Sequence, residues 1–597
     1  MIALKRWPLA AKIALIVGAV VVVYLPALRA GFVWDDEPLI TANPLMRNLS
    51  GLGEIWSGSR TADYFPITNS AFWIESHLFG GNATGYHVVS ILLQAANALL
   101  VWRVLRRLEI PGAFLAGLIF GIHPVHAESV AWISELKNML AMFFFLLSAL
   151  CFFEIEDRRI LRRPVAFGAS LLFFVLALLS KTQVVFLPVA LLLCAWWRSL
   201  RDKKRFHRET VRTVPFFLLA LVFGLITIWF QSRGIGEEEI VLGSFPRRLT
   251  NAGMAMWWYA KQVFVPIRLM AVYPRLRFDS PDAVEWLPLL ALVAALSLAW
   301  FLRTRRGGGL FFALAYFVVA LLPVVGLLRM AYARSGTLVA DHLQYFADVS
   351  LIALFSAGLA HLWVSRRSVM RIAGGVALVF LLSTMGTYTW ARTGVFRDEE
   401  TLWRDNFAKN PDAWQGHNRV GQILFNQGRF AEAAHHFERA AQLKPELADN
   451  YNSLGLAYCR LERFEEGIAE YRKGLQLKEQ KSSTAKSSGT ATMRTNLANV
   501  LALTANNLSD RAQTASRTEA ETDRKIAMDR YEEAIVQYEK ALEISPQQPA
   551  IHRNLGILLA NLGRIDEAVP HLQRVLQLVP NEPLARETLD AIESQRR

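Results

Sequence analysis

The sequence predicts an all-α protein in two parts, a polytopic helical membrane domain followed by an α-solenoid. Three observations support this prediction. Apolar segments of about 17–25 residues, the length that crosses a bilayer, recur before about residue 392. Short blocks of Arg and Lys separate alternate segments, as in the cytoplasmic loops of membrane proteins. After residue 412 the chain becomes polar and repeats with a period of 34 residues.

Composition places the chain among membrane proteins and not among nucleic-acid binders. Of its 597 residues 53% are hydrophobic, and its net charge is +14. The basic residues occur in blocks between apolar segments, such as RVLRR at 103–107 and RSLRDKKRFHRETVR at 198–212. We therefore expect membrane lipids, and no nucleic acid, as partners. The three cysteines lie far apart and indicate neither a disulfide framework nor a metal site.

About eleven membrane spans are expected. The third is short and should extend into the loop that follows, and the first is expected to remain uncleaved because Leu28 is too bulky for a signal-peptidase site. A further apolar segment, 250–271, contains Lys261 and Arg268; a crossing there would invert every later loop, so we expect a re-entrant or interfacial helix. The spans lie near 9–28, 86–105, 112–122, 139–155, 164–180, 184–198, 212–231, 286–303, 309–328, 346–364 and 371–391.

The basic blocks also predict sidedness. Placing them inside makes 29–85 the first external loop and puts the C-terminal part on the same outer side. The predicted location is the cytoplasmic (inner) membrane of a bacterium-like cell, with this loop and the C-terminal repeats in the periplasm. The predicted domains are a membrane domain at 1–392, a linker helix at 393–411 and a repeat domain at 412–597.

The C-terminal repeats have the period and the small residues of tetratricopeptide repeats (TPRs). About four repeats are expected, the third interrupted by a polar insertion near 504–527, and the Ser/Thr/Lys-rich stretch 478–491 should be flexible. Such an array predicts a concave surface for a peptide or protein but does not identify it. Residues exactly one period apart are Gly421 and Gly455, Ala534 and Ala568, and Pro546 and Pro580.

Polar residues gather at the predicted outer ends of the spans, where charged groups are functional candidates. Asp35 and Asp36 directly follow the first span. A carboxylate that loses solvation there gains a raised pKa and can act as a general base. The alternative is an ordinary solvated helix end, or a carboxylate paired with an Arg.

A second cluster lies in HPVHAESVAWISELKNML at 123–140. His123, His126 and Glu128 are of the types that bind zinc, but Pro124 breaks the helix between the two histidines and we predict no metal site. A hydrogen-bonding pocket that includes Glu135 and Lys137 is the preferred interpretation.

Basic side chains on the same face could hold an anionic lipid headgroup. For any single one, snorkelling toward the interface is the alternative. ADHLQYFADV at 340–349, with Asp341, His342 and Tyr345, is a weak signal by itself. The basic candidates are Lys181, Arg233, Lys261 and Arg334.

Taken together, the ordered segments GFVWDDEPLITANP, YFPITNSAFWIESHLFGGNATGYHVVS, FGIHPVHAESVAWISELKNML, LLSKTQVVFLP and ADHLQYF, followed by TPRs, resemble the TMTC (transmembrane and tetratricopeptide-repeat) family, here in a bacterial form. The resemblance implies a GT-C type glycosyltransferase that uses a polyprenyl-phosphate-linked sugar and carries a catalytic acidic residue in the first external loop, which matches Asp35 and Asp36. In animals the family is associated with protein O-mannosylation. Two positions depart from the pattern: Phe65 stands where relatives often have Arg or Gln, and His342 where Arg is frequent, which predicts an altered donor-phosphate contact at these places.

The resulting hypothesis is transfer of a mannose-like monosaccharide from a polyprenyl-phosphate donor to Ser or Thr hydroxyls of an exported protein held on the TPR groove. No cofactor is expected besides this lipid-linked substrate, and a need for a divalent metal stays open. A non-catalytic membrane-anchored TPR scaffold, or a transferase with a glycan or lipid acceptor, are the alternatives. The expected site comprises catalytic Asp35 and Asp36; pocket residues Tyr64, His87, His123, His126, Glu128, Glu135 and Lys137; and phosphate-binding Lys181, Arg233, Lys261, Arg334 and His342.

Overall fold

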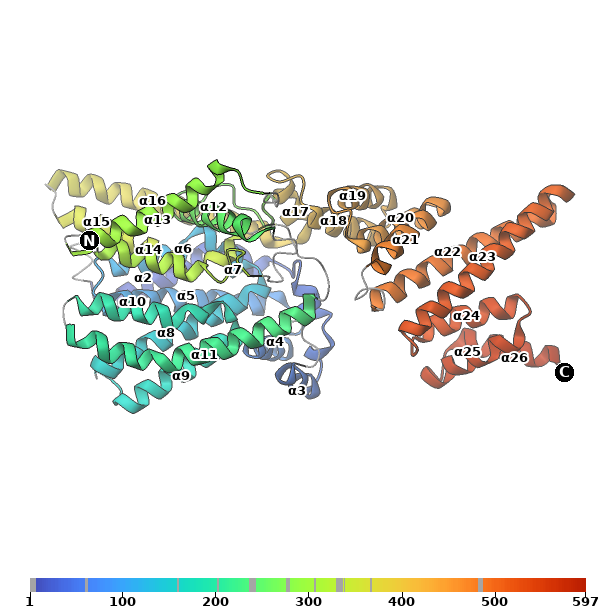
Figure 1. Cartoon of the computed structure of the whole chain (residues 1–597), viewed down its shortest axis with the longest axis horizontal. Coiled ribbons are helices and arrows are strands. Elements are labelled where there is room, and N and C mark those ends of the chain that lie inside the picture. The colour runs from blue at the N-terminus through green and yellow to red at the C-terminus, as the bar shows by residue number, and fades with distance from the viewer. Residues whose placement is uncertain are drawn as a thin grey trace. The chain divides into compact units, whose positions relative to one another are not determined.

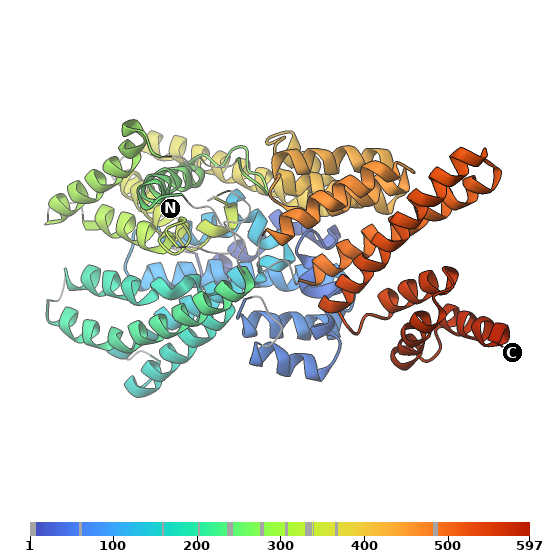
Figure 2. The same ribbon diagram turned by 45° about the vertical axis from the view of Figure 1, so that its right-hand side comes forward.

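The protein is all-helical in a computed structural model, which describes residues 7–58, 63–157, 160–200, 203–235, 243–274, 280–304, 308–328, 337, 339–364, 368–480 and 487–596. Within these residues no strand occurs. The chain divides after Pro411 into a membrane unit and a repeat unit. Each unit is described by itself below (Figures 1 and 2).

The membrane unit contains apolar helices at every one of the predicted spans. Among the described residues eight helices are long and apolar enough to cross a membrane, two helices bent by 45° form a further candidate, and two apolar helices are shorter. The bend confirms that the short third segment continues past its helix. The eight are Leu9–Arg29, Ala83–Arg107, Ile133–Asp157, Arg163–Ser180, Thr182–Ser199, Phe206–Ser232, Ala283–Thr304 and Arg371–Arg397; the bent pair is Ala113–Ile122 with Pro124–Ala131, and the shorter two are Gly308–Leu321 and Asp348–Leu362.

These helices form one bundle with a shared apolar core. α8 packs along α5 and α9, and α10 packs along α11, which the two views show consistently (Figures 1 and 2). The helices of the bundle are α2 (Leu9–Tyr24), α5 (Ala83–Arg107), α6 (Ala113–Ile122), α7 (Ala127–Ala131), α8 (Leu136–Asp157), α9 (Arg163–Ser180), α10 (Leu187–Ser199), α11 (Lys203–Ile235), α13 (Leu287–Phe301), α14 (Gly308–Leu321), α15 (Asp348–Val364) and α16 (Ser368–Gly394).

The segment expected to be interfacial forms α12 (Phe245–Phe264), which is not among the helices apolar enough to span. It begins earlier than expected because the Ser244 hydroxyl accepts from the Arg247 N–H and caps the helix. Arg247 is buried, and its guanidinium contacts Glu285 at 2.8 Å. This pairing turns one face of α12 toward the protein.

The first loop folds into short helices that cover one end of the bundle. They are η1 (Leu25–Arg29), η2 (Glu37–Thr41), η3 (Pro44–Met46), α3 (Leu49–Ser57) and α4 (Pro66–Phe79). Thr68 on α4 donates a hydrogen bond to the Ser180 carbonyl at the end of α9. We call this end of the bundle the loop end.

The repeat unit consists of antiparallel helix pairs. Glycines at the repeat positions allow paired helices to approach, because a Cβ on Gly421 would lie 2.7 Å from the Phe437 ring and one on Gly556 2.9 Å from Leu572. The helices are α18 (Trp414–Asn426), α19 (Phe430–Leu443), α20 (Ala448–Arg460), α21 (Phe464–Glu479), α22 (Ser488–Thr514), α23 (Arg517–Ile544), α24 (Pro549–Asn561), α25 (Ile565–Leu578) and α26 (Pro583–Arg596).

The polar insertion continues the helices of the third repeat. α22 and α23 run through it as one long hairpin, turning at Ala515 and Ser516. The Arg511 guanidinium donates to both carboxylate oxygens of Asp523 across the hairpin. Of the stretch predicted to be flexible, residues 481–486 lie outside the described residues, and the chain is helical again from Ser488.

Candidate functional site

Three interruptions of helical structure meet at the loop end of the membrane unit. Trp132 and Lys181 each adopt extended backbone between two helical segments, and Ala340 is extended directly before η10 (Asp341–Gln344). Irregular backbone at membrane depth persists only where it is buried in protein or lines a cavity. These breaks turn the side chains that follow them toward a common space.

That space is a cavity of about 210 Å³ lined by both charged and apolar side chains. Its polar lining comes from the breaks just described, from α8 and α11, and from the first loop. The lining residues are Asp63, Phe65, Glu135, Lys137, Lys181, Thr182, Gln183, Val185, Gly224, Thr227, Ile228, Gln231, Pro323, Val324, Leu328, His342 and Leu343.

A buried carboxylate organises the basic groups of this cavity. The Lys137 Nζ lies 2.9 Å from Glu135 Oε1, and the Lys181 Nζ lies 3.5 Å from Glu135 Oε2. The His342 Nε2 lies 3.9 Å from Glu135 Oε1. Asn138 donates to the same carboxylate and so fixes its orientation. A group of basic side chains gathered round one anion is also able to receive a second, such as a phosphate.

Glu128 binds both the backbone and the ring of His342. The His342 N–H donates to Glu128 Oε2 at 3.0 Å, and the His342 Nδ1 lies 3.3 Å from Glu128 Oε1. The neighbouring Asp341 accepts a 2.7 Å hydrogen bond from the Tyr273 hydroxyl. Glu128 therefore supports the cavity without lining it.

Asp36 is fully buried beside this cavity. Its Oδ1 accepts from the N–H and the hydroxyl of Ser134 at 2.7 and 2.5 Å, and its Oδ2 accepts from the Val33 N–H at 2.9 Å. Burial raises the pKa of this carboxyl from its ordinary value of 3.8 to about 7, against the opposing effect of these donors. Three donors on two oxygens tie the first loop to the start of the Glu135 segment.

Asp35 faces differently from its neighbour. It is only partly buried, and it lies close enough to Lys137 for their charges to interact. The difference arises at Trp34, whose φ of +53° lies in the left-handed region that non-glycine residues rarely adopt. The Trp34 ring stacks on Trp132, with centroids 4.9 Å apart.

Five residues predicted for the pocket do not line it: Glu128, described above, and His123, His126, His87 and Tyr64. His123 contacts the Val263 carbonyl at 3.0 Å through Nε2, and His126 contacts the Phe120 carbonyl and Asp348. His87 is buried beside the backbone of Ala30 and Gly31. The Tyr64 hydroxyl donates to the Trp56 carbonyl, and its ring stacks on Phe230.

The predicted phosphate-binding residues fall into three groups. Lys181 and His342 line the cavity. Lys261 is exposed on α12 and is not among the lining residues. Arg334, and the side chain of Arg233 at the end of α11, lie outside the described residues.

Several residues in or beside the cavity were not predicted from the sequence. Asp63 lies in the first loop and accepts a 3.1 Å hydrogen bond from Gln231 on α11. Ser134 holds Asp36, and Gln183 donates to the Leu343 carbonyl at 2.8 Å. The only sequence signal for Asp63 was its place directly before the YFPIT segment, whose apolar residues supplied no periodic pattern.

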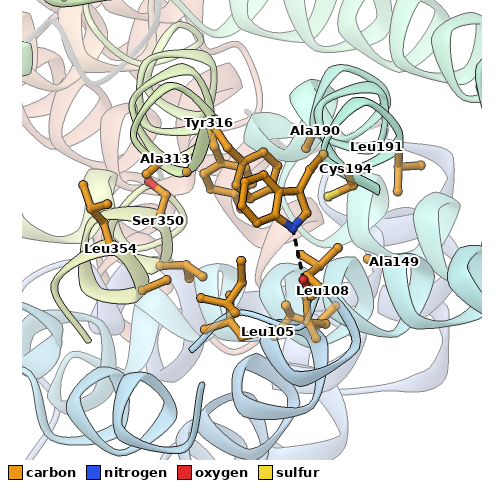
Figure 3. Close-up of a pocket in the computed structure, with 18 of the residues that line it drawn as sticks. Leu105, Leu108, Ala149, Ala190, Leu191, Cys194, Ala313, Tyr316, Ser350 and Leu354 are labelled. Atoms are coloured by element: carbon orange, nitrogen blue, oxygen red, sulfur yellow. Dashed lines mark hydrogen bonds between the residues drawn. The ribbon is translucent and has the colours of Figure 1, made fainter. Parts of the chain in front are cut away.

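A second, apolar cavity of about 270 Å³ lies along the same helices. Figure 3 shows its lining from α5, α8, α10, α14 and α15, with the Trp197 indole N–H donating to the Leu108 carbonyl at 3.0 Å. Phe186 lies between the two cavities in sequence, because Val185 lines the charged one and Leu187 the apolar one. The ring of Phe186 contacts Phe145, Tyr316 and Phe346. Aromatic rings thus pack round Phe186 where the chain passes from the lining of the charged cavity to that of the apolar one.

Comparison with known proteins matches both parts of the chain. Residues 66–230 match the family described as dolichyl-phosphate-mannose-protein mannosyltransferase. TPR families match residues 421–462, 448–481, 523–563 and 549–582. A solved structure of residues 41-end of MamA from Desulfovibrio magneticus RS-1 has a TM-score of 0.24 and 14% identity, and covers 31% of this chain and 87% of that chain.

Curated relatives include three proteins named as protein O-mannosyl-transferases. F38B6.6 of Caenorhabditis elegans is 23% identical, covering 73% of this chain and 63% of its own length. Tmtc1 of Drosophila melanogaster is 24% identical, covering 72% and 61%, and human TMTC4 is 24% identical, covering 71% and 65%. The chain thus spans less than two thirds of the length of these relatives. The resemblance to TMTC proteins is confirmed, since a mannosyltransferase-like segment and TPRs occur in one chain.

Proposed function

We propose that this TMTC-like chain is a GT-C type glycosyltransferase that transfers a mannose-like sugar from a polyprenyl-phosphate donor to Ser or Thr hydroxyls of exported proteins. The observation that carries the proposal is the charged cavity, in which Lys137, Lys181 and His342 surround the buried Glu135 beside the acidic first loop. Most of this cavity is built by the residues that match the mannosyltransferase family.

The two cavities suit the two parts of such a donor. The phosphate would lie against Lys181 and Lys137, whose charges Glu135 and Asp63 partly balance before it binds. The hydrocarbon chain would occupy the apolar cavity along α10, α14 and α15. To reach the apolar cavity the hydrocarbon chain would pass the aromatic rings around Phe186.

We assign the role of proton acceptor to Asp35 and a holding role to Asp36. Asp36 has no exposed surface and already accepts three hydrogen bonds, so an incoming hydroxyl cannot reach it without breaking the loop. Asp35 is partly exposed and lies near Lys137, so an incoming hydroxyl can reach its carboxylate.

The reaction then follows from these positions. The acceptor oxygen attacks the anomeric carbon while Asp35 takes its proton, and the bond between that carbon and the phosphate oxygen breaks. The lipid phosphate leaves with the bonding electrons, and Lys137 and Lys181 stabilise its charge. A single displacement inverts the anomeric centre. The TPR unit would present the acceptor, which requires it to lie on the same side of the membrane as the first loop.

The test measures transfer of radiolabelled mannose from polyprenyl-phosphate mannose to protein in membranes that contain equal amounts of each variant. Asp35→Asn should lower transfer by about 100-fold or more, because it removes the general base. The exposed neighbour Glu37, changed to Gln, is the matched control and should transfer normally. Label that is released from protein by β-elimination identifies Ser or Thr as the acceptor.

Three other outcomes would each contradict one part of the proposal: the base, the acceptor or the transferase activity. Wild-type transfer by Asp35→Asn would show that Asp35 is not the base. Label in a glycan or lipid fraction would replace the protein acceptor. If the folded wild-type chain transfers no sugar while partner capture depends on its TPR unit, the chain acts as a membrane-anchored scaffold.

A further inference from the structure

The segment between the two units is built into the frame of the charged cavity. α17 (Glu399–Phe407) was expected to be a linker, yet residues up to Pro411 belong to the membrane unit. Its sequence explains this, because Glu399, Trp403, Asn406 and Asn410 are spaced as one helical face and its continuation. An adjacent, solvent-facing side of the helix carries Glu400 paired with Arg404, both largely exposed.

One end of this face holds the first loop. The Trp34 N–H donates to Glu399 Oε1 at 2.8 Å, and the Gly31 N–H donates to the Arg397 carbonyl at 2.9 Å. The Trp403 ring, which is fully buried, packs edge-on against Trp34 with centroids 5.1 Å apart. These contacts hold the residue directly before the acidic pair.

The other end of this face binds the segment at Val272, which is linked to the neighbour of His342. Asn406 accepts from the Val272 N–H at 2.8 Å, and the Asn410 side chain donates to the Val272 carbonyl at 3.0 Å. The adjacent Tyr273 donates to Asp341, the neighbour of His342. One short helix therefore braces both the loop that carries Asp35 and the segment that carries His342.

The backbone of Trp34 shows why such bracing is needed. A left-handed conformation is unfavourable for a bulky residue and persists only where surrounding contacts impose it. Here the contacts are the Glu399 hydrogen bond and the Trp132 and Trp403 rings on either side. The Trp34 turn in turn directs Asp36 inward to Ser134 and leaves Asp35 toward Lys137.

We propose that Glu399 on α17 is a positioning residue that holds the Trp34 turn and thereby sets the relative placement of Asp35 and Asp36. The helix that leads to the TPR unit is then part of the catalytic frame, and disturbing it changes turnover without touching substrate. The catalytic consequence rests on the proposed function; the structural part does not.

The first measurement needs no activity. Hydrogen exchange of the full-length protein in nanodiscs compares wild type, Glu399→Ala, Glu399→Gln and the control Glu400→Ala, which removes an exposed charge from the next position of the same helix. Glu399→Ala should accelerate amide exchange at least tenfold in peptides covering 31–36, and Glu399→Gln should restore most of the protection because its amide oxygen can accept the same bond. Glu400→Ala should match wild type. Unchanged exchange in Glu399→Ala would overturn the proposal.

The second measurement separates positioning from general stability. With polyprenyl-phosphate mannose as donor, Glu399→Ala should lower kcat about tenfold and leave the donor KM within twofold, since the phosphate site is not touched. Glu399→Gln should recover most of kcat. A Glu399→Ala variant with accelerated exchange and normal kcat would show that α17 is only structural. If wild type itself transfers no sugar, the proposed function fails, and the exchange experiment alone decides whether Glu399 holds the turn.

Discussion

Replacing Glu135 by Gln is the most direct perturbation of the charged cavity. The amide keeps the size of the side chain and a partner for Asn138, but removes the anion that faces two lysines. At an effective dielectric constant of 20, attraction across 2.9 Å and 3.5 Å is about 6 and about 5 kcal/mol. Desolvation offsets part of this, and removing one member of a buried ion pair costs about 3–5 kcal/mol in net stability.

We therefore expect Glu135→Gln to lower the unfolding free energy by about 3–5 kcal/mol. SDS titration of the purified protein, followed by tryptophan fluorescence, would measure the loss, with Glu37→Gln as the exposed control. A polyprenyl monophosphate should then stabilise the variant more than the wild type, because its phosphate replaces the missing anion. The double variant with Lys181→Met should recover part of the loss, giving a coupling energy of about 1–3 kcal/mol. Coupling below about 0.5 kcal/mol would refute the view that these groups form one ionic unit.

Three further predictions concern the first loop, the apolar cavity and the repeats. The pKa of the Asp36 carboxyl is about 7 in the folded state and ordinarily 3.8, so between these pH values the folded state binds one more proton than the unfolded state. The unfolding free energy should therefore fall by up to about 4 kcal/mol as pH rises from about 4 to 7, and Asp36→Asn should lose this dependence. SDS titrations at pH 4.5 and 7.5 measure it, and an equal change in wild type and variant would contradict the prediction. Ala190→Trp should fill the apolar cavity and raise the KM for a long-chain donor about tenfold, the equivalent of two methylene groups that are no longer buried. The KM of this variant for a two-isoprene donor, and the KM of the exposed control Ala294→Phe for either donor, should match wild type. Equal effects of Ala190→Trp on both donors would show that the lipid chain binds elsewhere. Gly421→Val should destabilise the repeat unit by about 1–3 kcal/mol in thermal unfolding, because its side chain would clash with the Phe437 ring, and unchanged unfolding would contradict that packing.

The sequence was sufficient for the positions of the spans and for much of the charged cavity. Glu135, Lys137 and Lys181 each adjoin the end of an apolar segment, and alternation of the segments puts those ends on one side of the bundle. Ends on one side of a bundle lie near one another, so residue type and position together predicted their meeting. The same reasoning identified the acidic loop.

The sequence was not sufficient to distinguish side chains that point into the cavity from those that point into the bundle. His123 and His126 lie at the same end of the bundle as the cavity, but their rings contact backbone carbonyls within the bundle. The directions of these side chains depend on the break in the helix at Pro124, which the spacing of residues does not specify. The different surroundings of Asp35 and Asp36 depend on the left-handed backbone of Trp34. Such backbone is usually predicted from a glycine, and this position is a tryptophan. α17 is rich in charged residues and lies in the predicted linker helix, and its polar contacts to Trp34 and Val272 leave no apolar pattern that marks a packed face.

The long hairpin of the third repeat has a practical consequence for imaging. Its tip is a short turn at Ala515 and Ser516, and the capping box of Ser516 and Glu519 begins α23 directly after it. Exposed turns between stable elements accept inserted domains with little loss of stability. A rigid marker protein inserted before Ala515 would add a recognisable mass to a mostly membrane-embedded particle, and would aid alignment in electron cryomicroscopy while leaving the packing of the repeats intact.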